Sequence, residues 1–189
     1  MKLNKLSVIL SVVALFLVGS AIIAVKLSHS GGEKTDNQNQ ECLVSIEEKI
    51  VQGYSLSGLI EDGQTIKAFI GYYDCHEIKR GDLILYSYAG SSDPLLKIVK
   101  AIPGDSFSLQ NTAAGWSILI NQEVLKNSEN EPYALDERGH LMLSLYEHDY
   151  GGVIPANTYL IMGNLAGGST DSSRFGLIDK NDILGRAEI

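Results

Sequence analysis

The sequence predicts a mainly β domain of residues 42–189 behind a single N-terminal transmembrane helix. The first observation is an apolar run from Leu6 to Val25, where 20 consecutive residues are uncharged and 16 of them are aliphatic or aromatic. The second is a succession of short apolar runs after residue 42, separated by Gly, Asn, Asp and Pro, which is typical of strands and turns. No window of 11 or more residues in that region sustains a helical stripe, so we expect any helix there to be short.

The run 6–25 has the length of a membrane anchor. About 20 apolar residues match the roughly 30 Å hydrocarbon core of a bilayer, whereas the apolar part of a cleavable signal peptide is about 7 to 15 residues long. We therefore expect an uncleaved anchor in contact with lipid. A cleavable signal peptide stays the alternative, because Gly19-Ser20-Ala21 has small residues spaced like a cleavage site.

The charges beside the anchor predict its orientation. Lys2 and Lys5 precede it within the tail 1–5, whereas Lys26 alone follows before the signs mix. By the positive-inside rule the tail is cytoplasmic and the rest of the chain is extracytoplasmic. We therefore expect a single-pass protein of the inner (cytoplasmic) membrane with its domain on the periplasmic side.

Residues 26–41 are expected to be a flexible tether. Ser28 to Glu41 contains no aliphatic side chain and no Phe, Tyr or Trp, so the segment can bury little. Fourteen such residues reach about 20 Å on average, which would keep the domain near the membrane surface. The net charge of −8, with no basic run beyond Lys79-Arg80, argues against a nucleic-acid partner.

Within the domain, six apolar runs of strand length stand between turn signals. They are Leu83–Tyr88, Leu95–Ile102, Trp116–Ile120, Leu141–Leu145, Thr158–Met162 and Ile183–Ile189. The segment near Ser45–Val51 is the place where we expect a short helix.

The two cysteines, Cys42 and Cys75, leave two interpretations open. An extracytoplasmic location permits a disulfide between them, which the sequence does not decide. Asp74-Cys75-His76-Glu77 also contains metal-ligand types, but adjacent residues point in different directions and there is no second cluster. We therefore favour a surface turn there and expect neither a metal nor another cofactor.

The sequence favours a lysine over a histidine as a catalytic base. The four histidines, at 29, 76, 140 and 148, lie in the tether or in polar stretches, and none is spaced as a metal pair. Lys97 shares one strand face with Leu95 and Val99, and Lys100 lies between Ile98 and Ile102. Lowering the pKa of a buried lysine by about three units costs about 4 kcal/mol, which an apolar site can impose. The pattern does not choose between the two lysines.

Four segments together resemble the motifs of the bacterial signal peptidase I family, in the family's order. Gly53–Gly63 is similar to G-x-S-M-x-P-T-L-x-x-G, Lys79–Tyr86 to R-G-D-I-V-x-F, Leu96–Asp105 to I-K-R-V-x-G-x-P-G-D, and Met162–Gly176 to a closing S-x-D-S-R-x-x-G box. Each motif alone is weak. Their joint order and spacing behind an anchor is specific, and the resemblance implies an antiparallel β domain like that of the family.

The resemblance also implies site residues. Counting back eight from Gly63 places the nucleophile at Ser55, and counting back six from Pro103 places the catalytic lysine at Lys97; Ser57 fits neither count. Ser169 is implied as a hydrogen-bonding partner of the lysine, with Ser172 as a weaker candidate. Gly53 stands where some relatives place a second oxyanion-hole serine, so it brings no hydroxyl to that role.

Several positions depart from the family pattern. Leu56 replaces Met, Gly58 replaces Pro, Ser173 stands where the closing box has Arg, and the G-D-N-R tetrad is reduced to Gly163-Asn164. The eroded motifs and the single anchor resemble more closely the conjugative-transfer, TraF-type branch of the family.

The function we expect is that of a membrane-anchored serine endopeptidase with a Ser/Lys dyad. It would cleave leader or C-terminal segments from translocated, membrane-bound precursor proteins, and a narrower form would mature or cyclise pilin subunits. The alternative is a non-catalytic, membrane-tethered β domain in a secretion or conjugation assembly.

Overall fold

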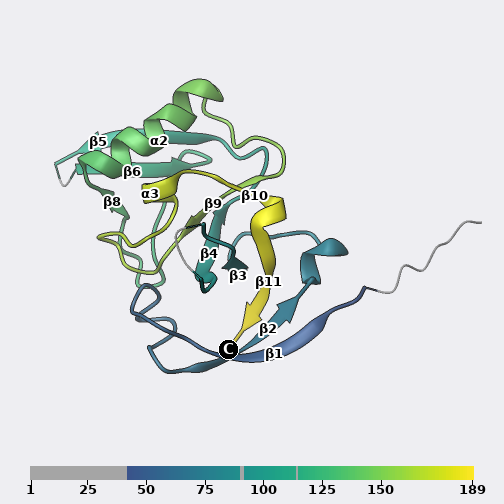
Figure 1. Ribbon diagram of the computed structural model, residues 1–189. Coiled ribbons are helices and arrows are strands. Elements are labelled where there is room, and N and C mark those ends of the chain that lie inside the picture. The colour runs from purple at the N-terminus through teal and green to yellow at the C-terminus, as the bar shows by residue number, and fades with distance from the viewer. Residues whose placement is uncertain (1–41, 90–91, 114) are drawn as a thin grey trace, which may run out of the picture. The chain divides into compact units, whose positions relative to one another are not determined.

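A computed structural model describes residues 42–89, 92–113 and 115–189 (Figure 1). The expected tail 1–5, anchor 6–25 and tether 26–41, and the alternative of a cleavable signal peptide, lie outside the described residues. Within the described ranges, no helix is long and apolar enough to cross a membrane.

A seven-stranded sheet forms the larger part of the fold, and every pair of neighbouring strands in it is antiparallel. In spatial order it contains β1 (Ser45–Ile50), β2 (Thr65–Ile70), β11 (Ile183–Glu188), β3 (Leu83–Tyr86), β4 (Leu95–Ala101), β9 (Thr158–Met162) and β10 (Ile178–Asp179). The last strand of the chain thus lies between β2 and β3. The mainly β, antiparallel domain expected from the sequence is confirmed.

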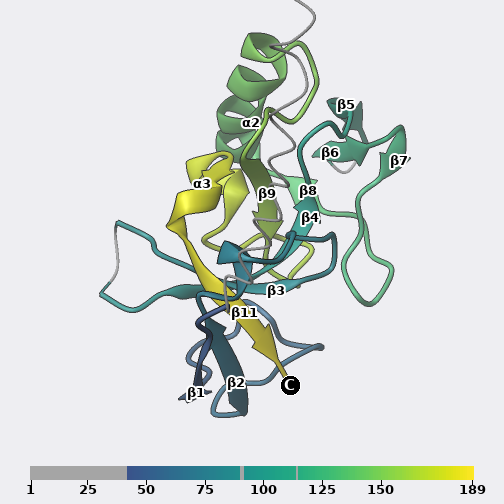
Figure 2. The ribbon, with the colours of Figure 1, turned by 90° about the vertical axis from the view of Figure 1, so that its right-hand side faces the viewer.

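A smaller antiparallel sheet carries the one longer helix of the described residues. It contains β5 (Phe107–Thr112), β6 (Gly115–Ile120), β7 (Glu123–Val124) and β8 (Ala134–Leu135), with β7 and β8 both paired to β6. Helix α2 (Glu137–Asp149) follows β8 and packs beside β5, at the end of the molecule opposite β1 and β2 (Figures 1 and 2). The short helices are η1 (Tyr72–Asp74), α3 (Ser172–Phe175) and η2 (Lys180–Asp182).

Five of the six expected strands are present, as β3, β4, β6, β9 and β11. The sixth is wrong, because Leu141–Leu145 lies inside α2. Asp136 begins this helix by accepting a hydrogen bond from the Gly139 N–H. The helix fully buries only Gly139 and Leu143, while Leu141 and Leu145 are exposed. Its buried stripe is therefore narrow, and leucine at every second position of this segment has the spacing expected of one face of a strand.

The short helix expected near Ser45–Val51 is also wrong, because this segment is β1. Six residues of β1 pair in register with β2, from Ser45 opposite Ile70 to Ile50 opposite Thr65. Its side chains are almost all exposed, so backbone pairing to the neighbouring strand stabilises it. An edge strand with both faces exposed to solvent does not need alternating apolar residues, so its sequence does not show the pattern by which strands are predicted.

An apolar cluster lies beneath the turn that joins β1 to β2. Its buried members are Val51, Leu56, Ile60, Ile66, Ile98 and Ala187, which come from that turn and from strands β2, β4 and β11. Leu56 and Ile60, four residues apart, are almost completely buried. Burying two such side chains contributes about 3 to 6 kcal/mol, which fixes the turn against the sheet.

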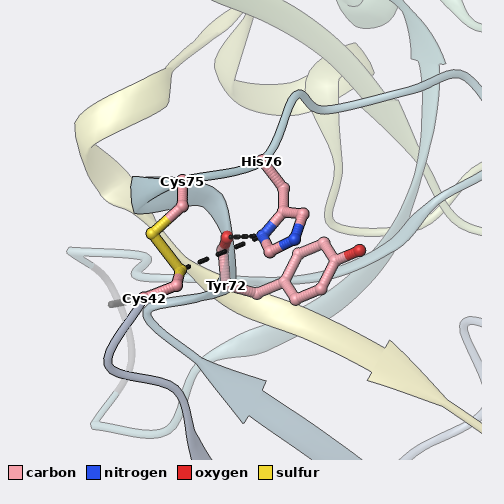
Figure 3. Close-up of a disulfide and its surroundings, with 4 residues drawn as sticks. All are labelled: Cys42, Tyr72, Cys75 and His76. Atoms are coloured by element: carbon pink, nitrogen blue, oxygen red, sulfur yellow. Dashed lines mark hydrogen bonds between the residues drawn. A yellow bond between two sulfur atoms is a disulfide. The ribbon is translucent and has the colours of Figure 1, made fainter. Parts of the chain in front are cut away.

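Cys42 and Cys75 form a disulfide with a Cα–Cα distance of 5.9 Å (Figure 3). The bond joins the start of the described domain to the end of η1 and closes a loop that contains β1, the following turn and β2. Beside it, the His76 ring stacks on Tyr72 with 4.0 Å between centroids, and His76 Nδ1 lies 2.8 Å from the Tyr72 carbonyl oxygen. Cys75 is thus not available as a metal-binding thiolate in this oxidised form.

Candidate active site

Ser55 and Lys97, which are 42 residues apart in the chain, meet in the folded domain. Lys97 Nζ lies 2.8 Å from Ser55 Oγ and 2.9 Å from the Leu96 carbonyl oxygen, to which it donates. Ser55 is half-buried in the turn between β1 and β2, and Lys97 is on β4. The structure therefore brings together the two residues that their spacing within the family's motifs singles out.

The turn that carries Ser55 is held by its own backbone hydrogen bonds. At its base, the Val51 N–H donates to the Gln64 carbonyl and the Gly63 N–H donates to the Val51 carbonyl, at 2.8 and 2.9 Å. Within it, the Ile60 N–H donates to the Leu56 carbonyl at 2.9 Å. These hydrogen bonds and the buried Leu56 and Ile60 fix the backbone of the turn that carries Ser55.

Burial changes the chemistry of Lys97. The side chain is only 3% exposed and projects from the middle of β4, where the strand pairs with Ile84 of β3. Burial lowers the pKa of Lys97 from 10.5 to about 8, and the charge of Asp171 opposes this effect. At mildly alkaline pH the amine is therefore largely neutral, which is the form that accepts a proton.

Lys100 has different surroundings, although the sequence pattern could not separate it from Lys97. Its Nζ donates to the Lys126 carbonyl at 2.9 Å and lies 5.3 Å from the centre of the Tyr133 ring. Burial lowers the pKa of Lys100 as well. Lys97 is the more deeply buried of the two lysines, and only Lys97 lies beside Ser55 Oγ.

Asp171 organises the closing motif, and the sequence did not single it out. Its carboxylate is fully buried; one oxygen accepts from Ser169 Oγ at 2.6 Å and from the Gly163 N–H at 3.0 Å. The other oxygen accepts from the Ser173 N–H and Ser173 Oγ, at 3.0 and 2.7 Å. Ser173, which stands where the family motif has Arg, thus supplies two neutral donors to Asp171. One acid among four hydroxyl residues of the segment 169–173 is the signal that could have identified it.

The remaining predicted site residues are placed as follows. Ser169, which the resemblance implies as a hydrogen-bonding partner of Lys97, donates its hydroxyl proton to Asp171, while the described hydrogen bonds of Lys97 Nζ go to Ser55 Oγ and the Leu96 carbonyl. Ser172 Oγ accepts from the Ile161 N–H at 2.9 Å and so fastens the closing motif to β9. The Gly53 N–H donates to Asp62 Oδ1 at 2.8 Å, which occupies this backbone donor within the turn.

Gly163 lies in close contact with both Ser55 and Ser169. A Cβ at this position would lie 2.6 Å from the Ser55 carbonyl oxygen and would overlap Ser169 Oγ. Only glycine therefore lets the end of β9 approach the turn this closely. The contact joins the nucleophile segment to the closing motif.

An ion pair links the two middle motifs around Lys97. Arg80, just before β3, donates through Nε to Asp105 Oδ2 at 2.8 Å, and its second nitrogen pairs with Asp105 Oδ1. Asp105 follows β4 and also accepts from the Ile102 N–H and from Asn121 Nδ2, both at 2.9 Å. The pair fastens the start of β3 to the turn after β4, so it stabilises the strand pair that carries Lys97.

Comparisons with known proteins identify the family of the chain. The family model "Signal peptidase, peptidase S26" matches residues 1–189. Signal peptidase IB of Staphylococcus aureus (strain COL) is 24% identical over 147 residues, which cover 72% of each chain. Signal peptidase I P of Bacillus subtilis subsp. natto is 26% identical over 149 residues, which cover 74% of each chain.

Among solved structures, a signal peptidase I from Enterococcus faecalis V583 is similar, with a TM-score of 0.42 and 20% identity over 59% of this chain and 97% of the other. Because the family model extends over the whole sequence, it is the match that assigns the family. The chain belongs to the signal peptidase family, peptidase S26, and is a serine endopeptidase of that family.

Proposed function

We propose that Ser55 and Lys97 form the catalytic dyad of a membrane-anchored endopeptidase that cleaves translocated precursor proteins. The observation that carries this proposal is the 2.8 Å distance between Ser55 Oγ and the buried Lys97 Nζ. A lysine with a pKa of about 8 serves as a general base near neutral pH, whereas an exposed lysine does not. The two residues thus have both the geometry and the protonation state that the reaction needs.

The reaction proceeds in two balanced halves. Ser55 Oγ attacks the scissile carbonyl carbon while its proton passes to Lys97 Nζ, and the lysine then gives this proton to the leaving amine as the peptide bond breaks. The product is an acyl-enzyme ester on Ser55. Lys97, neutral again, takes a proton from a water that attacks the ester, and returns it to Ser55 Oγ as the new carboxylic acid leaves. The net reaction is hydrolysis of one peptide bond.

The developing oxyanion requires backbone donors. The Gly53 N–H is bonded to Asp62, and glycine brings no hydroxyl. The Ser55 N–H is therefore the donor we expect at the oxyanion, because it is attached to the attacking residue itself.

Asp171 acts on Lys97 through its charge, and Ser169 supports Asp171 with a hydrogen bond. The hydrogen bond to Asp171 fixes the Ser169 hydroxyl in the closing motif beside Gly163. The negative charge of Asp171 raises the pKa of Lys97 and burial lowers it, and the balance of these two effects is a pKa of about 8. Ser172 supports this segment by accepting the Ile161 N–H.

The substrates we propose are secreted preproteins presented at the outer surface of the membrane. The family model and the named relatives are signal peptidases. The apolar run 6–25 is the proposed anchor of this chain, and the tether would hold the dyad near emerging cleavage sites. Pilin maturation is a narrower prediction, and product mass tests it, since a cyclised product is lighter than the linear chain by one water.

The experiment is precursor cleavage by the detergent-solubilised full chain with Ser55→Ala, and Ser57→Ala is the matched control from the same turn. Ser55→Ala should abolish cleavage while the domain stays folded, and Ser57→Ala should retain it. Cleavage by Ser55→Ala at the wild-type rate would disprove the dyad, and no cleavage by the wild-type chain itself would favour the non-catalytic β domain.

A further inference from the structure

Asn164 lies directly after Gly163 at the end of β9, is 1% exposed, and uses each of its polar groups. Its N–H donates to the Ser55 carbonyl at 2.6 Å, and its side-chain Nδ2 donates to the Ser57 carbonyl at 2.9 Å. Nδ2 also donates to Ser128 Oγ, and Oδ1 accepts from the Ser128 N–H, at 2.8 and 3.0 Å. Its carbonyl accepts from Asn127 Nδ2 at 3.0 Å.

Two of these bonds hold the turn that carries the candidate nucleophile. They fall on the carbonyl oxygens of Ser55 itself and of the residue two places later, so they fix the backbone on either side of Leu56. A peptide plane held at both carbonyls cannot rotate without leaving a buried polar group unpaired, which is costly. The direction of the Ser55 side chain depends on these planes.

The other bonds connect this turn to the loop Asn127–Glu131, which joins β7 to β8 of the smaller sheet (Figure 2). Asn127 Oδ1 accepts from the N–H groups of Glu129 and Glu131, at 3.0 and 2.9 Å, so the loop is itself fixed. Asn164 thereby joins elements from both sheets at the candidate active site.

Gly58 allows the loop to approach the turn. Its φ of 84° is closed to proline, whose ring fixes φ near −65°, so the proline of the family motif does not fit this turn. A Cβ at Gly58 would lie 2.9 Å from Glu129 Oε1 and 3.3 Å from Asn164 Nδ2. Where the family motif stiffens the turn with proline, tertiary hydrogen bonds do so here.

We propose that Asn164 is a positioning residue that holds Ser55 in line with Lys97 by clamping the backbone carbonyls of Ser55 and Ser57 against the loop 127–131. This inference rests on the proposed function, because the clamp matters for catalysis only if Ser55 is the nucleophile. An asparagine is required, since one amide must donate to Ser57 and Ser128 while accepting from the Ser128 backbone.

The test compares Asn164→Ala and Asn164→Asp with wild type as detergent-solubilised full chains at pH 9. Asn164→Asp keeps the shape but turns a carboxylate oxygen toward the Ser57 carbonyl, so it should be no milder than Asn164→Ala. We expect kcat for precursor cleavage to fall on the order of 100-fold, as for a nucleophile displaced by about 1 Å, with KM changed by less than about threefold. Amide hydrogen exchange of residues 53–60 should become about tenfold faster while that of α2 is unchanged.

Leu143→Ala is the control for a merely structural role. Leu143 is fully buried in the core beside the smaller sheet, so its truncation costs stability through a cavity but leaves the clamp intact. It should keep wild-type kcat per folded molecule. The proposal is overturned if both Asn164 variants keep kcat within about twofold of wild type, if exchange of residues 53–60 does not change, or if Leu143→Ala loses kcat equally.

Failure of the clamp and failure of the dyad give different results. If Ser55 is not the nucleophile, Ser55→Ala stays active whatever the Asn164 variants do. If the clamp alone is wrong, Ser55→Ala is inactive and the Asn164 variants are not.

Discussion

Replacing Lys97 with Met should make the protein more stable at neutral pH although it removes the proposed base. In wild type, folding moves the lysine pKa from 10.5 to about 8, which corresponds to a penalty of about 3.4 kcal/mol on the charged amine. Met has similar length, no charge and a flexible stem, so it fills the same site without this penalty. It loses the hydrogen bonds to Ser55 Oγ and the Leu96 carbonyl, about 1 kcal/mol each. The net gain at pH 7 is about 1 to 2 kcal/mol.

The difference in free energy of unfolding between wild type and Lys97→Met should change with pH in favour of wild type as the pH rises. Between pH 8 and 10.5 the unfolded chain binds the lysine proton and the folded chain has lost it, so wild-type stability rises with pH in this window. From pH 7 to pH 10 wild type should gain about 2.5 kcal/mol relative to Lys97→Met, and the order of stability should reverse.

The assay is urea unfolding of the detergent-solubilised full chains at pH 7, 8, 9 and 10, read as the difference in free energy of unfolding. Lys67→Met is the matched control, because Lys67 is an exposed lysine on β2. Its difference from wild type should be flat over the same range. Two results would refute the inference that burial destabilises the charged form of Lys97. One is a difference in free energy of unfolding between Lys97→Met and wild type that does not change with pH. The other is a Lys97→Met variant that is less stable than wild type by several kcal/mol at pH 7.

Three further predictions concern the rest of the site and the fold. Precursor cleavage should rise about tenfold between pH 7 and pH 9, following the neutral fraction of Lys97, and a rate–pH profile without a midpoint near 8 would contradict this. Gly163→Ala places a methyl 2.6 Å from the Ser55 carbonyl oxygen and should lower kcat on the order of 100-fold. Gly167→Ala, whose methyl meets nothing within 4 Å, should keep the wild-type kcat. Equal kcat values for the two variants would exclude the close approach of Gly163 to Ser55. Replacing both cysteines with serine opens a crosslink that spans 33 residues and should lower the free energy of unfolding by about 4 kcal/mol in a urea titration; a loss below about 1 kcal/mol would show that the crosslink constrains little.

The strands were predictable from the sequence because their signals are local. Runs such as Thr158–Met162 have strand length and composition, and the structure has a strand with the same bounds. Ser55 and Lys97 were located through the family resemblance, by their spacing to Gly63 and Pro103 within its motifs, and the fold brings them within hydrogen-bond distance.

The residues around the dyad were not singled out from the sequence, because the contacts that decide their roles form only in the fold. Asn164 donates to a carbonyl 107 residues earlier, and an asparagine after Met-Gly carries no sign of such a contact. Asp171 became visible as an organiser only when the fold placed it beneath the Gly163 N–H. Helix α2 was missed because Leu141, Leu143 and Leu145 recur at every second position, the spacing of one strand face, although only Leu143 is buried in the helix.

The measurement that tests the central claim most directly is the initial rate of precursor cleavage by Lys97→Met and Lys100→Met at pH 9. Burial lowers the pKa of both lysines, and only Lys97 lies beside Ser55 Oγ. We predict no detectable cleavage by Lys97→Met and a rate near that of wild type for Lys100→Met. Cleavage by Lys97→Met at the wild-type rate, or loss of cleavage in Lys100→Met alone, would contradict the assignment of the catalytic base.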